Sequence, residues 1–340
     1  MKPVYNEGTP QMSHSVLKSA VKRGALIAAA NWPVTLIQAS ADSLFKLLLA
    51  APLVGGVFLV ALAIGGEPTA IISPESREMM ATIATALIAR PVVLTAFLLA
   101  VAVVAVGGSV FVFLIKAGTV ATLVQSDREA ASIEEPPLHV SAVLRASRFS
   151  VDSYVDSARL LFPRYLRLGF ALMAVYLVSG LAYLAGVINR DSSEGWIVTA
   201  LTTAAFAAWI TFVNLAYLLV QIVVAADDCS VPAAIRRAAT FVRHERRHVA
   251  AVFLLVLAVI VAATGASILA TAALGLVAFV PFVGLAALPL QLLAWLLRGL
   301  VFQYLGLASV GAYLKLYRGF ATTRNGLTAT STYDHAWRTT

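Results

Sequence analysis

The residues His244-Glu245-Arg246-Arg247-His248 match the H-E-x-x-H pattern of zinc metalloproteases. On a helix, two histidines four residues apart share a face and can bind one zinc ion, while the glutamate between them activates water. The pattern still needs a third protein ligand. Candidate third ligands lie upstream of the pattern and near the end of the chain: Asp227, Asp228, Cys229, Asp334 and His335.

The surroundings of this pattern favour a simpler interpretation. Arg246 and Arg247 would place positive charge beside a divalent cation, and the pattern ends a basic run that begins at Arg236. Basic runs are typical of the cytoplasmic loops of membrane proteins. We therefore expect no metal and no cofactor. A membrane zinc protease that uses His244, Glu245 and His248 stays an alternative.

Arg298 is a second candidate, because it lies inside a long apolar run. A cation within a membrane span is costly and usually faces protein or a water-filled cavity. Gln291 precedes it on the same predicted helix face, and Asn214 and Gln221 share a face of another apolar run. These four residues predict a polar intramembrane seam. It could contact an anion or lipid phosphate, line a transport pathway, or simply join two helices by hydrogen bonds.

A third set of candidates is the arginines that precede the fifth apolar run. Arg236, Arg243 and Arg247 form a stripe at helical spacing, while Ile235 and Val242 face another way. A helix with two such faces suits a lipid headgroup surface, and it could equally pack on the ends of a helix bundle. The candidate lipid-binding or anion-binding residues are Arg236, Arg237, Arg243, Arg247 and Arg298.

Other catalytic patterns are absent from the sequence. It contains no phosphate-binding G-x-x-x-x-G-K-[ST], no Gly-x-Gly-Asp, and no serine with a histidine base in the same or another apolar run. We therefore predict that the protein is not an enzyme and assign no catalytic residue.

The elements that must position these candidates are membrane-spanning helices. The chain is 60% hydrophobic and 12% charged, whereas soluble domains carry about 25% charged residues. One span needs about 20 apolar residues, and the charge-free stretch from Val249 to Leu297 must therefore fold back, near Pro281 to Gly284. Six spans are predicted: 44–66, 92–116, 167–189, 197–226, 249–274 and 285–314.

Lysine and arginine concentrate in alternate connections. They are frequent at both ends of the chain and in the connections 116–167 and 227–248. The positive-inside rule then places both termini in the cytoplasm of a plasma (inner) membrane protein. The net charge of +8 belongs to these loops, so we expect no nucleic-acid partner. The remaining connections hold only Arg77, Arg90 and Arg190.

We divide the chain into a cytoplasmic N-terminal segment with an amphipathic helix (1–43), a six-span membrane domain (44–318) and a disordered cytoplasmic tail (319–340). The predicted fold is an all-α, polytopic integral membrane protein. Amphipathic cytoplasmic interfacial helices would lead into each pair of spans, as three helix-plus-hairpin repeats. The three repeats begin alike, at Ser15–Ala20, Ser141–Ala146 and Ala233–Ala238.

The last repeat has features of a known group. It carries a short basic helix, Ala233-Ala234-Ile235-Arg236-Arg237-Ala238, a long apolar hairpin with central prolines, and a final span that ends in Ala312-Tyr313-Leu314-Lys315-Leu316-Tyr317-Arg318. It resembles bacterial six-helix membrane proteins of unknown function, among them the membrane domain attached to some glycerophosphoryl diester phosphodiesterases. The resemblance implies a membrane domain. It carries over no catalytic residue, because the soluble phosphodiesterase domain is not present.

These observations lead to one main functional prediction. The protein is a non-catalytic membrane protein that organises lipid, including anionic lipid, or a partner protein at the cytoplasmic face, where it could also form homo-oligomers. The alternative is a transporter or export component that uses the polar seam around Arg298.

Overall fold

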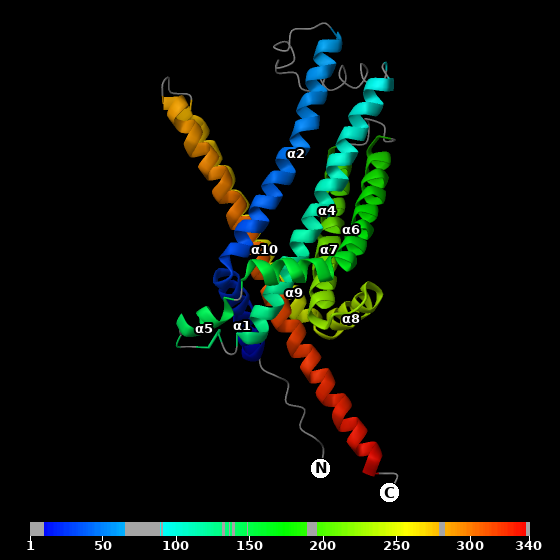
Figure 1. Ribbon diagram of the computed structural model, residues 1–340, viewed down its shortest axis with the longest axis vertical. Helices are drawn as coiled ribbons and strands as arrows, with labels where there is room; N and C mark the ends of the chain where they lie inside the picture. Colours follow the sequence, from blue (N-terminus) through cyan, green and yellow to red (C-terminus); the bar gives the residue numbers. More distant parts are fainter. Residues whose placement is uncertain are drawn as a thin grey trace. The chain divides into compact units, whose positions relative to one another are not determined.

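The protein is described by a computed structural model that covers residues 10–64, 89, 91–130, 133–135, 137, 140–147, 149–188, 196–278 and 283–337. Every regular element in these ranges is a helix (Figure 1), as predicted. The helices are α1 (Pro10–Ala30), α2 (Trp32–Ile64), α4 (Pro91–Glu129), α5 (Val140–Ala146), α6 (Val151–Ile188), α7 (Trp196–Asp227), α8 (Val231–His244), α9 (Arg246–Ala278) and α10 (Val283–Trp337).

Six helices in the described part of the chain are long and apolar enough to cross a membrane, namely α2, α4, α6, α7, α9 and α10. Their number agrees with the six spans predicted from the sequence. By length and composition, these helices indicate a multi-pass integral membrane protein.

The chain forms two compact units, one of residues 1–39 and 116–340 and the other of residues 40–115. In the second unit, α2 and α4 pack through glycines. A Cβ atom on Gly56 would lie 2.3 Å from the Phe97 ring, and one on Gly108 would lie 2.2 Å from the Phe45 ring. Each aromatic ring therefore rests directly on the backbone of the opposite helix, where no side chain would fit.

The buried core of the first unit includes residues of α1, α4, α6, α7, α8, α9 and α10. The parts of α9 and α10 nearest the α9–α10 connection expose large apolar side chains, such as Leu269 and Leu293. Such exposed surfaces suit contact with lipid. The largest fully buried side chains of the core include Ile27, Leu123, Tyr165, Phe241, Leu307 and Leu314.

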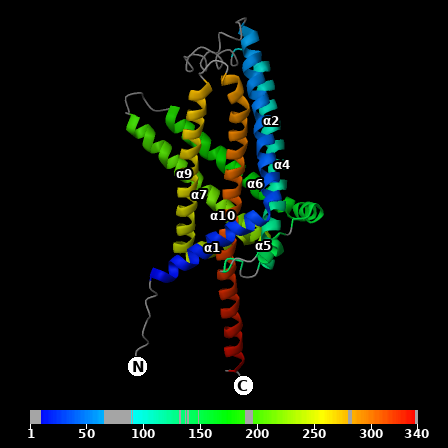
Figure 2. The same ribbon diagram turned by 90° about the vertical axis from the view of Figure 1, so that its left-hand side faces the viewer.

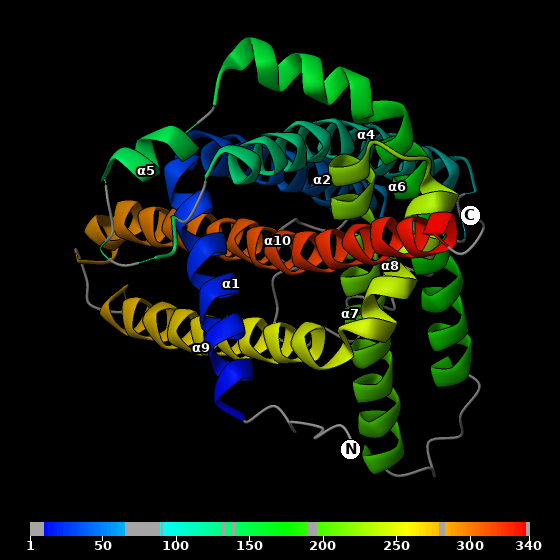
Figure 3. The same cartoon turned by 90° about the horizontal axis from the view of Figure 1, so that it is seen from below.

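Helix α1 crosses α9 and α10 instead of running alongside them (Figures 2 and 3). The crossing is close because glycines meet there: a Cβ atom on Gly24 would lie 2.2 Å from the Ala308 carbonyl oxygen, and one on Gly311 would lie 2.7 Å from the Cα of Gly24. Asn31 forms the turn into α2. Its buried amide donates to Ser126 Oγ and to the carbonyl oxygen of Ala146, both at 3.0 Å.

The helix bounds differ from the predicted spans at several ends. Helix α2 begins at Trp32, so the boundary drawn at residue 43 falls inside it, and α4 continues from the expected end at residue 116 to Glu129. Helix α6 begins at Val151 and changes direction along its length (Figure 1); Pro163, which cannot donate a backbone hydrogen bond, lies inside it. An apolar run predicts only the part of a helix that suits contact with lipid. The helix itself can extend beyond that part, because it continues as long as its backbone hydrogen bonds continue.

Helix α10 continues to Trp337, through most of the segment 319–340 that the sequence assigns to the cytoplasmic tail. The hydroxyl groups of Thr322 and Thr323 donate to the carbonyl oxygens of Arg318 and Gly319. These bonds satisfy the polar side chains on the helix itself. The turn predicted at Pro281 lies outside the described residues.

Candidate functional site

Helix α8 has two faces of different chemistry. Ala234, Ala238 and Phe241 are buried, and the Phe241 ring meets the Tyr317 ring of α10 edge-on, with centroids 5.5 Å apart. The opposite side carries exposed arginines and continues into the first turn of α9. The exposed arginines of this region are Arg236, Arg237, Arg243, Arg246 and Arg247.

The carboxylates nearest α8 already have partners. Asp227 accepts hydrogen bonds from Arg237 Nη1 and from the Tyr317 hydroxyl, both at 2.6 Å. Asp228, whose backbone has a φ of 46°, pairs with Arg164 of α6. Arg237, predicted as a lipid-binding residue, therefore already neutralises a carboxylate. We call the other four arginines, which pair with no described carboxylate, the basic surface: Arg236, Arg243, Arg246 and Arg247.

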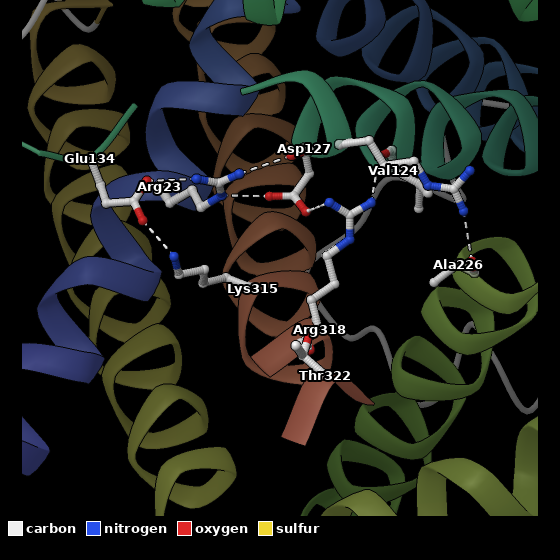
Figure 4. Close-up of polar contacts among 9 residues, drawn as sticks. Arg23, Val124, Asp127, Glu134, Ala226, Lys315, Arg318 and Thr322 are labelled. Atoms are coloured by element: carbon white, nitrogen blue, oxygen red, sulfur yellow. Dashed lines mark hydrogen bonds and ion pairs between the residues drawn. The ribbon is translucent and has the colours of Figure 1, made fainter. Parts of the chain in front are cut away.

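A buried ion cluster joins α1, α4 and α10 (Figure 4). Asp127 Oδ1 lies 2.5 Å from Arg23 Nε, and its Oδ2 lies 2.5 Å from Arg318 Nη1. Arg23 also donates to the Asp127 carbonyl oxygen, and Arg318 donates to that of Val124. Both carboxylate oxygens are therefore paired although the side chain is only 1% exposed.

Glu134 extends this cluster. Its carboxylate accepts hydrogen bonds from Arg23 Nη1 at 2.7 Å and from Lys315 Nζ at 2.5 Å, and its carbonyl oxygen accepts one from Lys22. Burial alone would raise the pKa of the Glu134 carboxyl, but the hydrogen bonds from Lys315 and Arg23 outweigh it and lower that pKa below its ordinary value. Glu134 therefore stays ionised to a lower pH than a solvated glutamate.

The H-E-x-x-H residues do not share one helix. Helix α8 ends at His244, Glu245 adopts φ −104° and ψ 27°, and α9 begins at Arg246. Glu245 Oε2 lies 2.7 Å from His248 Nδ1, and His244 Nδ1 lies 3.2 Å from the carbonyl oxygen of Thr240. The break removes the shared helix face on which the zinc pattern depends. Among the described residues, no three His, Cys, Asp or Glu side chains are placed to hold a metal ion.

The predicted polar seam is assembled only in part. Asn214 and Gln221 line one pocket of about 280 Å³, but the residues that α10 contributes to it are Ser309 and Tyr313. Arg298 is exposed elsewhere on α10, with its guanidinium carbon 5.7 Å from the centroid of the Phe302 ring. Gln291 does not line the pocket either.

The register between α7 and α10 explains this difference. The hydrogen bond between Tyr317 and Asp227 joins residues 90 apart in the sequence. With that offset, Gln221 lies level with the region around Gly311, whereas Arg298 lies more than three helical turns away along α10. Equal spacing of polar residues on two helices does not fix which of them meet.

Sequence reasoning missed the ion cluster and the buried turn at Asn31. By sequence, Arg23 is only one of the positive charges that precede the first apolar run. Asp127 and Glu134 were not singled out, although carboxylates are scarce in a chain with 17 of them among 340 residues. The scarcity of carboxylates could have indicated these two residues, because a carboxylate in a connection rich in lysine and arginine has many potential ion-pair partners.

No protein-family model, curated protein or solved structure matches this chain.

Proposed function

We propose that the protein is a non-catalytic membrane protein of the bacterial inner membrane that binds anionic lipid at its cytoplasmic face through the basic surface. The observation that carries this proposal is the charge balance around α8. Asp227 and Asp228 are bound to Arg237 and Arg164, so no carboxylate among the residues that the structure describes pairs with the basic surface. Lipid phosphates would supply that negative charge.

The apolar side chains beside these arginines support lipid as the partner. Ile235 is half exposed next to Arg236, and Phe241 fixes the opposite face of α8 to the rest of the unit. A helix held in this way could place isoleucine at the acyl boundary and arginine among the head groups. A partner protein with an acidic surface is the other class of ligand that these exposed arginines could bind.

The wider architecture belongs to the same proposal. Helix α1 precedes α2, and α8 precedes α9, which fits three units of an amphipathic cytoplasmic helix followed by a hairpin. Both termini would then lie in the cytoplasm. A relationship of the last unit to the membrane domain attached to some glycerophosphoryl diester phosphodiesterases is also proposed, on the residues quoted above, and it adds no catalytic role.

The test compares lipid binding by two triple variants of the full-length protein. Native mass spectrometry of the detergent-solubilised protein would count bound phosphatidylglycerol and phosphatidylcholine during titration. We expect the wild type to prefer phosphatidylglycerol. Changing Arg236, Arg243 and Arg247 to glutamine should weaken phosphatidylglycerol binding about tenfold or more, because each removed arginine weakens attraction to an anionic head group.

The control variant removes the same charge from other exposed positions, by changing Lys18, Arg145 and Arg159 to glutamine. It should keep most of the preference for phosphatidylglycerol. Equal losses in the two variants would mean that net charge and not the basic surface binds lipid. A wild type without any preference for phosphatidylglycerol would disprove the proposal.

A further inference from the structure

A pocket between α7, α9 and α10 holds polar groups that have no partner. Its volume is about 280 Å³. The hydroxyl groups of Tyr217 and Tyr313 and the side-chain nitrogen of Gln221 are buried and form no hydrogen bond with any described residue. These three side chains are 7%, 2% and 3% exposed, respectively. All three line the pocket.

Positive charge is added by Lys116 of α4, which also lines the pocket. Its Nζ lies 5.4 Å from the centroid of the Tyr217 ring. The phenol hydroxyls, the amide nitrogen and the ammonium group can all donate hydrogen bonds. Among these groups, the two phenol hydroxyls and the Gln221 amide nitrogen are buried without an acceptor among the described residues, which is rare in proteins and costs free energy. A ligand that completes this pocket should therefore offer several acceptor oxygens and a negative charge.

The other wall of the pocket is apolar. It is formed largely by α9, through Phe253, Val256, Leu257 and Ile260. Helix α7 ends and α9 begins next to α8 in the chain, and α10 contacts α8 near its Tyr317, whose ring meets that of Phe241. Tyr313 and Gln221 therefore lie at the end nearer α8, and Ile260 lies at the end farther from it. Because Leu257 is partly exposed, the apolar wall continues to the surface that would face lipid.

We propose that this pocket binds a single-chain amphiphile whose head is a carboxylate or a phosphate. The head lies among Tyr217, Gln221, Tyr313 and Lys116, and the chain follows the apolar wall of α9 toward Ile260. The volume is close to the lower end of the ~300–1,000 Å³ range of ligand sites, which favours one acyl chain over two. This site is separate from the basic surface, and it does not depend on the function proposed above.

The test uses the full-length protein in phosphatidylcholine nanodiscs and palmitate that carries a photoreactive diazirine. We expect saturable labelling that peptide mapping assigns to α9 and α7. Unlabelled palmitate and 1-palmitoyl lysophosphatidate should compete, whereas uncharged hexadecanol should compete about tenfold less well, because it lacks the charged acceptor oxygens. The stronger of the two anionic competitors identifies the head group as carboxylate or phosphate.

The variant removes the hydroxyl groups and keeps the rings, by Tyr217→Phe together with Tyr313→Phe. Its half-saturating palmitate concentration should rise about tenfold, because two hydrogen bonds to a charged head are lost. The control is Tyr304→Phe on α10, whose hydroxyl donates to the Ala25 carbonyl oxygen outside the pocket. This variant should bind palmitate like the wild type.

A second measurement, of the melting temperature Tm, distinguishes loss of palmitate binding from misfolding of the double variant. Palmitate should raise the Tm of the wild-type protein, and the double variant should be at least as stable as wild type without palmitate, since its removed hydroxyls have no partner. Four outcomes would each overturn the proposal. They are labelling that does not saturate, a wild-type Tm that palmitate leaves unchanged, competition by hexadecanol equal to that by the anionic lipids, and unaltered palmitate binding by the double variant.

Discussion

Asp127 keeps a negative charge almost completely out of solvent because two guanidinium groups from different helices pair with it. Arg23 binds one of its oxygens and Arg318 binds the other. Removing such ions from water costs several kcal/mol each, and only complete pairing offsets that cost. The cluster therefore stabilises the contact between α1, α4 and α10 only when all of its charged groups are paired.

We predict that Asp127→Asn destabilises the protein by about 3–5 kcal/mol, because it leaves the buried Arg23 and the partly buried Arg318 without their shared counter-charge. Unfolding of the purified protein, followed in a mild detergent with added denaturing detergent, would measure the loss. The matched control is Asp42→Asn. Asp42 pairs with Lys46, whose side chain is 62% exposed, and exposed pairs contribute about 0–1 kcal/mol. Equal effects of the two changes would contradict the role given to the cluster.

The sequence predicted the positions of some candidate residues and not of others. The exposed arginines of α8 follow directly from helical spacing, because the chemistry of a helix face depends on neighbours three and four residues away. The pairing of Arg23 with Asp127 joins residues 104 apart, and no local pattern contains that information. His244 and His248 show a different limit of local pattern, because a motif that requires one continuous helix spans a break at Glu245.

At the scale of elements, the crossing of α1 over α10 depends on two glycines. Gly24 and Gly311 allow the backbones of the two helices to touch. This contact brings Arg23, the residue before Gly24, within reach of Asp127. The hydroxyl of Tyr304 adds a hydrogen bond to the Ala25 carbonyl oxygen at 3.1 Å. The position of α1 therefore depends both on close backbone contact and on the ion pairs of Arg23.

Gly24→Ala should push α1 away from α10, because the new Cβ would lie 2.2 Å from the Ala308 oxygen and 2.6 Å from the Ala312 nitrogen. Both atoms belong to the backbone and cannot move aside alone. We expect a loss of stability of about 1–3 kcal/mol and faster proteolysis of α1, both measured on the purified protein. Gly306→Ala is the control, since a Cβ atom there meets open space. A Gly24→Ala protein as stable as the Gly306→Ala protein would refute the close crossing.

Apolar runs located the spanning helices well where the helix ends with the run. Helix α7 covers Trp196–Asp227, against a predicted span of 197–226. Helices α2, α4, α6 and α10 extend beyond the spans that the apolar runs predict. The ends of those helices are stabilised by tertiary contacts, such as those of Asn31 with Ser126 and Ala146, which hydropathy does not measure.

At the scale of the whole molecule, the sidedness predicted from lysine and arginine can be tested on the single cysteine. Cys229 lies between α7 and α8 and is partly exposed. Burial raises the pKa of its thiol, so labelling should be slow but measurable. A membrane-impermeant maleimide should leave Cys229 unlabelled in intact cells and label it after permeabilisation.

The control moves the thiol to the other side, by Cys229→Ser combined with Ser193→Cys in the connection between α6 and α7. That variant should be labelled in intact cells. Labelling of native Cys229 without permeabilisation would reverse the predicted orientation, and with it the cytoplasmic position of the basic surface.

The sequence alone determined that the protein is helical, that six helices can cross a membrane, and that arginines recur at helical spacing from Arg236 to Arg247. Each of these depends on composition or on neighbours within a few turns. The tertiary structure decided that Asp127 and Glu134 bind Arg23, Lys315 and Arg318, that Arg298 lies apart from Asn214 and Gln221, and that Tyr217 and Tyr313 line one pocket. These relations depend on the register and crossing of helices far apart in the chain, which are set by packing and not by local pattern.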